Sequence, residues 1–205
     1  MAHGFRRTRH GVRARLDDNE RALVAHLLVE VHEMLDDESS GETDPLAALV
    51  GIGTAVDAPS DPAVARLLPD AYREDPDASA EFRRYTEVGL RQRKRDGLER
   101  TRRTLGRDGP VVLDDDEAQA WVVALTDVRL VLASRMGLET DDDHERLIAL
   151  AEAEAEAEAG GSGEVGESDE SEPGSALGAM LMVYDFLTWL QETLVEALLE
   201  PLPTD

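Results

Sequence analysis

The stretch "LDDDEAQAWVVALTDVRLVLASRMGL", from Leu113 to Leu138, decides the fold. Its four acids, Asp114 to Glu117, stand where the N-terminus of a helix favours negative charge, and Gly137 stands where a helix ends. Between them, apolar residues recur every three or four positions: Ala118, Trp121, Val122, Leu125, Val128, Leu132 and Met136. This is the period of a helix with one buried face, so the stretch predicts a long amphipathic helix that needs other helices as partners.

Other segments repeat this helical spacing. They are residues 18–35, 77–105 and 175–200, together with two short pieces that begin near a proline, Leu46–Val50 and Ala63–Leu68. In the long segment 77–105, Asp77 is the expected N-cap and Gly106 follows the expected last residue. The C-terminal segment is apolar on both sides over Met180–Leu190, which indicates a helix that is buried on both sides.

A minimal β-ribbon is expected near the N-terminus. Residues 5–8 and 12–16 flank the turn-prone pair His10-Gly11, and apolar residues alternate with arginines after it. Because a two-stranded ribbon is marginal alone, residues 111–113 are the expected third strand. The predicted fold class is therefore mainly α, with about five helices around one core of Leu, Val and Ala and a minimal β-ribbon near the N-terminus.

Residues 139–174 interrupt this organisation. Over residues 139–172, fourteen Asp or Glu stand against Arg146 alone, a net charge of −13, and the stretch "AEAEAEAEAGGSGEVGESDESEPGS" is of low complexity. Such a composition buries too little apolar surface to offset the entropy of ordering, so we expect a disordered or partly helical acidic insert. The chain is then one mostly helical domain made of residues 1–138 and 175–200, with residues 201–205 as a tail.

Positive charge is concentrated in one segment of a chain whose net charge is −24. Residues 83–107 hold ten Arg or Lys against three acids, and four of these arginines, spaced 7, 4 and 7 residues apart, line up within about 40° on a helix. We call these four the arginine row: Arg84, Arg91, Arg95 and Arg102. The row suits a phosphate backbone, because each guanidinium can donate two parallel hydrogen bonds. The alternative is a solvated helix that pairs its arginines with acids of neighbouring elements.

No pattern of a catalytic, cofactor-binding or metal-binding site stands out in the sequence. There is no cysteine, which excludes disulfides, thiolate metal ligands and cysteine nucleophiles. His26 and Glu30 stand one turn apart without a known ligand motif, and Gly51-Ile52-Gly53 lacks the rest of a dinucleotide motif. We expect a protein that is not an enzyme and has no evident small-molecule substrate. With neither a signal peptide nor a membrane span, the expected location is cytoplasmic.

The C-terminal helix carries more large apolar residues than one side of a surface helix needs. Phe186, Trp189 and Leu190 fall on its second apolar side. We expect either a homodimer that forms through these three residues or their burial beneath the long helix 77–105.

Four stretches of the sequence, in this order, resemble the AosR family of actinobacterial proteins. They are "GVRARLDDNERALVAHLL", "ARLLPDAYREDPDASAEFRRYTEVGLRQRKRDGL", "LDDDEAQAWVVALTDVRLVLASRMGL" and "VYDFLTWLQETLVEAL". The resemblance covers nearly everything outside residues 139–174. Members of that family are described as oxidative-stress transcriptional regulators, so the resemblance implies a DNA-binding, redox-linked role. The sequence departs from a thiol-based redox sensor, because it has no cysteine to oxidise.

These observations together predict a cytoplasmic transcriptional regulator that binds DNA or a partner in the transcription machinery through the arginine row. The alternative is a non-enzymatic adaptor whose arginines bind an acidic protein surface. A steep dependence of DNA binding on salt separates the two.

Overall fold

The computed structural model describes residues 3–36, 58–72, 74–160 and 176–201. In these ranges the elements follow the order β1 (His3–Thr8), β2 (Gly11–Arg15), α1 (Asp18–Asp36), α3 (Pro62–Leu67), α4 (Pro76–Leu105), β3 (Val111–Leu113), α5 (Asp115–Met136), α6 (Asp141–Gly160) and α7 (Ala176–Leu199). The predicted fold class, mainly α with a small β-ribbon near the N-terminus, is confirmed. The short helix expected at Leu46–Val50 lies outside the described residues.

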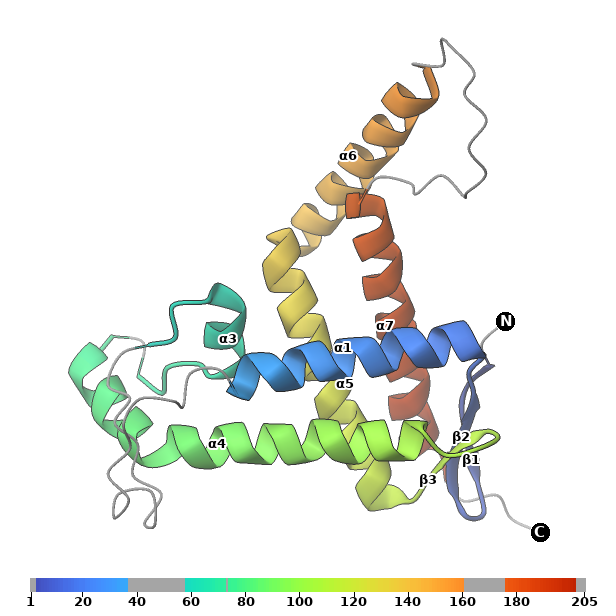
Figure 1. The fold of residues 1–205 in the computed structure, drawn as a ribbon, viewed down its shortest axis with the longest axis horizontal. Helices are drawn as coiled ribbons and strands as arrows, with labels where there is room; N and C mark the ends of the chain where they lie inside the picture. The colour runs from blue at the N-terminus through green and yellow to red at the C-terminus, as the bar shows by residue number, and fades with distance from the viewer. Residues whose placement is uncertain (1–2, 37–57, 73, 161–175, 202–205) are drawn as a thin grey trace.

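The long helices form two crossed layers (Figure 1). Helices α1 and α4 lie side by side and run across α5 and α7, which pack against each other. Every layer contributes fully buried side chains to one core, among them Leu28 of α1, Leu98 of α4, Leu125 of α5 and Leu194 of α7. Trp121 of α5 is the largest fully buried side chain of this core among the described residues. A polar contact also ties the layers together, because Trp121 Nε1 donates a hydrogen bond to the hydroxyl of Thr104 in α4 at 2.7 Å.

The three strands form an antiparallel sheet in the order β1-β2-β3 at one end of the helices. Its inner face carries the buried side chains Phe5, Val12, Ala14, Val111 and Leu113. Phe5 meets Trp121 edge to face with ring centroids 5.5 Å apart. The hairpin requires Gly11, whose φ is +113° and whose Cβ would lie 2.0 Å from the carbonyl oxygen of Leu113. The predicted ribbon and its third strand are confirmed.

The helix ends follow the capping residues. In α5, the Asp114 side chain accepts from Glu117 N at 2.8 Å and the Glu117 side chain accepts from Asp114 N at 3.2 Å, a complete capping box. Gly137 ends α5 with a φ of +69°. Helix α4 starts earlier than predicted, because its N-cap is Asp75 rather than Asp77. Pro76 explains the difference, since the fixed φ and missing N–H of proline suit the first helical position.

Part of the acidic insert is helical. Residues Asp141–Gly160 form α6, which projects away from the other helices beside the start of α7 (Figure 1). Its first turns contact α7, where His144 Nε2 lies 3.6 Å from Asp185 Oδ1. Farther along, Ile148 and Leu150 are exposed. Residues 161–174 of the insert lie outside the described residues, and the division of the chain into domain, insert and tail stays a prediction.

The three residues of the predicted dimer surface differ in how far their side chains are exposed. Leu190 is fully buried in the core of the single chain, and the dimer surface stays a prediction. Helix α7 packs mainly on α5 and β1. Phe186 is half-buried and Trp189 is 37% exposed, with their rings 6.1 Å apart. Across the described residues, no helix is both long enough and apolar enough to cross a membrane.

Candidate functional site: the arginines of helix α4

Helix α4 buries a polar stripe along its N-terminal half. Ser79, Arg83, Glu87 and Arg91 follow one another at a spacing of four residues and are all buried. In the C-terminal half, the buried side continues with apolar and threonine side chains at Leu98, Thr101, Thr104 and Leu105. The helix therefore attaches to its neighbours through charged groups at one end and through apolar packing at the other.

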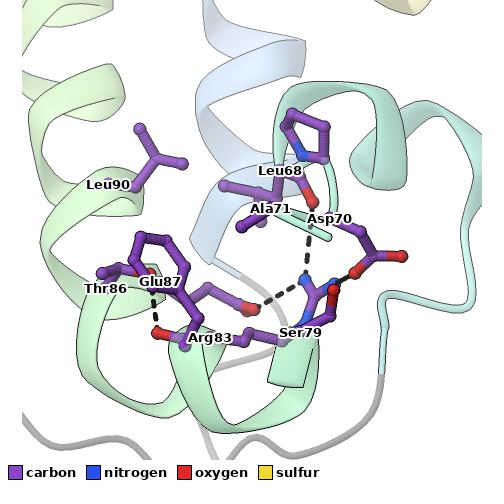
Figure 2. A pocket seen from close by; sticks show the side chains of 10 residues that line it. Leu68, Asp70, Ala71, Ser79, Arg83, Thr86, Glu87 and Leu90 are labelled. Atoms are coloured by element: carbon purple, nitrogen blue, oxygen red, sulfur yellow. Dashed lines mark hydrogen bonds and ion pairs between the residues drawn. The ribbon is translucent and has the colours of Figure 1, made fainter. Parts of the chain in front are cut away.

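Arg83, Glu87, Arg91 and Asp70 form a charge cluster that we call the α4 ion cluster. Arg83 donates to Glu87 Oε2 at 3.0 Å, to the Leu68 carbonyl at 3.4 Å and to Asp70 (Figure 2). Arg91 donates to Glu87 Oε1 at 2.9 Å. Two guanidiniums thus face two carboxylates, and the charges balance. Such a balanced and hydrogen-bonded arrangement is what makes buried charge tolerable.

The α4 ion cluster connects three segments. Arg83 reaches the loop after α3 through Leu68 and Asp70, and Arg91 donates to the carbonyl of Leu35, near the end of α1, at 3.2 Å. A pocket of about 50 Å³ lies beside it, with Pro69, Phe82 and Leu90 among its lining residues. This volume is well below the roughly 300 Å³ at which pockets for drug-sized ligands begin. The cluster therefore serves the attachment of α4.

A second buried pair joins α4 to α5. Lys94 Nζ lies 2.6 Å from Asp127 Oδ1, and the Asp127 side chain is 3% exposed. Burial raises the pKa of the Asp127 carboxyl above its usual value, while the hydrogen bond and charge of Lys94 lower it. Among the described residues, the other oxygen, Oδ2, is buried without a hydrogen-bond partner. The pair therefore connects α4 to α5, although burial of the Asp127 carboxylate away from water opposes the gain in free energy.

The structure places the four members of the arginine row in different environments. Arg84 is exposed, whereas Arg91 is 6% exposed and belongs to the α4 ion cluster. Arg95 is partly buried and pairs with Asp36 Oδ1 at 3.0 Å. Arg102 is exposed but donates to Glu99 at 2.8 and 3.0 Å. Acids of α4 and of α1 therefore pair with three members of the row, and the binding of nucleic acid by the row stays a prediction.

Two other arginines of α4 are exposed and have no acidic partner among the described residues. Arg93 and Arg100 stand seven residues apart, so they lie on the same side of the helix. Neither forms an ion pair with any residue in the described ranges. Together with Arg84 they are the α4 guanidiniums most available to an external anion. At 100° per residue, Arg93 and Arg100 lie on the opposite side of the helix from the arginine row and away from the buried Leu98 and Leu105, and this spacing is the sequence signal that identifies them.

Within the described ranges, no group of three or more His, Asp or Glu side chains is arranged to hold a metal ion. The exposed guanidinium groups of α4 can donate hydrogen bonds to anions directly.

Comparison with known proteins identifies the family. The family described as "Domain of unknown function (DUF2017)" matches residues 2–198. A protein of Mycobacterium tuberculosis (strain ATCC 25618 / H37Rv) named "Oxidative stress regulator AosR" is 32% identical over 212 residues, which cover 94% of this chain and 85% of that relative. The protein of the same name from Mycobacterium bovis gives the same identity and coverage. No solved structure matches the chain. The chain therefore belongs to the DUF2017 family and is a relative of the mycobacterial AosR proteins.

Proposed function

We propose that this protein is a cytoplasmic, non-enzymatic regulator of transcription in the response to oxidative stress. The observation that carries the proposal is the 32% identity, over 94% of the chain, to proteins named oxidative stress regulators. The similarity extends over the whole helical domain, so it includes the layers and the sheet that position the surface arginines.

The exposed arginines of α4 are the proposed contact to DNA or to a component of the transcription machinery. Arg93 and Arg100 are exposed on one side of α4, and Arg84 and Arg102 are exposed on the opposite side, so the two sides are separate candidate contacts. An incoming phosphate can displace Glu99 from Arg102, because surface ion pairs contribute only about 0–1 kcal/mol. The buried Arg91 and the partly buried Arg95 hold the helix in place instead of contacting the partner.

The stress signal must reach this protein without a thiol of its own. Cysteine oxidation is the common chemistry of redox sensing, and the chain has no cysteine. We infer that a partner or an effector reports the oxidative signal to it.

A protein adaptor is the second candidate, and one observation favours it. Tyr72, Phe82, Tyr85 and Val88 are exposed by 51, 47, 57 and 45%. Tyr72 packs edge to face on Phe82 with centroids 6.2 Å apart, and the other two follow Phe82 at intervals of three residues on α4. Exposed aromatic groups beside arginines are typical of protein–protein interfaces.

A gel shift separates the two candidates. The probe is duplex DNA from upstream of the protein's own gene, and the variants are Arg93→Glu and, as a control with the same charge change, Arg146→Glu on α6. DNA binding that weakens steeply with salt and is lost in Arg93→Glu alone supports the DNA contact. Equal loss in both variants indicates a general charge effect. The adaptor is supported if the DNA probe does not shift and if the wild-type protein captures a component of the transcription machinery in a pull-down that is lost when Tyr85 and Phe82 are replaced.

A further inference from the structure

The outer face of the three-stranded sheet is strongly basic. Arg6 of β1 and Arg13 and Arg15 of β2 are exposed on the face opposite the buried Val12 and Ala14. By contrast, Arg7 points to the other side of β1, where it meets Asp115 Oδ1 at 3.0 Å. Because side chains alternate between the two faces of a strand, Arg7 lies on the inner face in an ion pair, whereas Arg6, Arg13 and Arg15 lie on the outer face.

The strand register brings the outer arginines next to one another. Arg6 stands directly opposite Arg13, and Arg15 lies two positions farther along β2 on the same face. Like charges directly opposite each other destabilise a sheet. Over the described ranges, none of the three forms an ion pair, although the chain has 45 acidic residues against 21 Lys and Arg. Among the described residues, these three arginines therefore form a cluster of positive charge without acidic partners, and Arg6 and Arg13 repel each other.

We propose that this face of the sheet, defined by Arg6, Arg13 and Arg15, binds the phosphate backbone of double-stranded DNA. The proposal rests on the proposed function and adds a surface to it that is separate from helix α4. Arg13 and Arg15 are about 6.8 Å apart along the strand, so each guanidinium can donate to a different phosphate of one DNA strand.

The composition of the face favours DNA over an acidic protein. Protein interfaces have an apolar or aromatic centre, but the exposed side of this sheet offers Val112, opposite Arg13, as its large apolar side chain within the described residues. A patch of arginines without an apolar centre suits a partner that presents a row of negative charges, such as the phosphates of DNA. Binding would also relieve the repulsion between Arg6 and Arg13, because each would then face a phosphate.

Fluorescence anisotropy with the full chain and a random 25-base-pair duplex tests the proposal. The test variant replaces Arg6, Arg13 and Arg15 by Gln. The single variants Arg13→Glu and Arg146→Glu form a pair matched in charge, since Arg146 lies on α6. We expect the triple variant to lower the slope of log K against log salt by about two to three, because each lost phosphate contact removes about 0.9. We expect Arg13→Glu to weaken binding at least tenfold and Arg146→Glu to weaken it less than twofold.

The fold of each variant is checked independently by its melting temperature. Removal of the Arg6–Arg13 repulsion should leave that temperature unchanged or slightly raised in the triple variant. Wild-type affinity and salt slope in the triple variant would overturn the proposal, and loss of binding in Arg93→Glu alone would then assign DNA to α4. If the wild-type chain binds no duplex at low salt, the sheet proposal is wrong. The regulatory function through a protein partner is tested separately, by the transcript levels described in the Discussion.

Discussion

Arg91 Nε donates a hydrogen bond to Glu87 Oε1 at 2.9 Å, one helical turn away, and both side chains are buried on the inner face of α4. Glu87 also accepts from Arg83 at 3.0 Å, so a single carboxylate stands between two buried guanidiniums. Its charge is therefore the feature that allows α4 to pack against the ends of α1 and α3.

Replacement of Glu87 by Gln should destabilise the protein strongly. The substitution keeps the shape of the side chain but leaves two buried arginines with one carboxylate, and removal of one partner from a buried ion pair costs about 3–5 kcal/mol. Urea unfolding measures the loss. Glu81→Gln, at an exposed position of the same helix, should change the free energy of unfolding by less than about 0.5 kcal/mol. Equal small effects of the two variants would show that the α4 ion cluster is not structural.

Asp61 should contribute stability above pH 4 that is lost in acid. It caps α3 through Ala63 N at 2.8 Å and accepts two hydrogen bonds from Arg135 of α5. The hydrogen bond from Arg135 is the main reason that the pKa of Asp61 is lowered from 3.8. A lowered folded-state pKa means that the stabilisation is complete above 3.8 and disappears as the pH falls through the folded value.

Two substitutions separate the roles of Asp61. Asp61→Ala removes the cap and the ion pair and should cost about 1–2 kcal/mol at pH 7. Asp61→Asn keeps a good capping residue and should cost less. Urea unfolding at pH 7 and pH 3 should show that the gap between wild type and Asp61→Asn narrows in acid. A gap that does not change with pH would contradict the role of the carboxylate charge.

Gly4 should be required for the contact between β1 and α7. A Cβ at this position would lie 2.6 Å from Cγ2 and 2.8 Å from Oγ1 of Thr193, whose hydroxyl also accepts from Phe5 N at 3.1 Å. Gly4→Ala should therefore cost about 1–3 kcal/mol through overpacking, and less than that in a Thr193→Ala background. The control is Gly89→Ala in α4, where the Cβ meets no atom within 4 Å. That change should stabilise the protein by about 0.5–1 kcal/mol. Additive effects of Gly4→Ala and Thr193→Ala would refute the contact.

The distal part of the acidic insert should be dispensable for folding. Exposed Ile148 and Leu150 mark where α6 leaves α7, and an isolated Ala-Glu helix is marginal in water. Deletion of residues 152–172 should shift the melting temperature by less than about 2 °C, which corresponds to under 1 kcal/mol for a chain of this size. The His144 contact with α7 stays intact in this variant. A fall of more than about 5 °C would show that the insert contributes to the core.

The sequence predicted the features that depend on local chemistry. The capping acids and Gly137 of α5 act within one helical turn, and the alternation around His10-Gly11 is visible within twelve residues. The burial of Arg91 depends on Leu35, which lies 56 residues away, and that of Arg83 depends on Asp70 on a separate loop. A helical periodicity shows which residues share a side but not which acids will cover that side. For the same reason, the sequence did not separate the buried Leu190 from the exposed Trp189 beside it.

The proposed regulatory function is tested most directly by transcript levels before and after exposure of cells to peroxide. The comparison needs the wild-type strain, a strain lacking the gene, and the deletion strain complemented with the wild-type chain or with Arg93→Glu/Arg100→Glu. We predict that a defined set of peroxide-responsive transcripts loses its response in the deletion strain. The wild-type chain should restore that response, and the arginine variant should not, although it is folded and equally abundant. An identical peroxide response in the wild-type and deletion strains would contradict the proposed function.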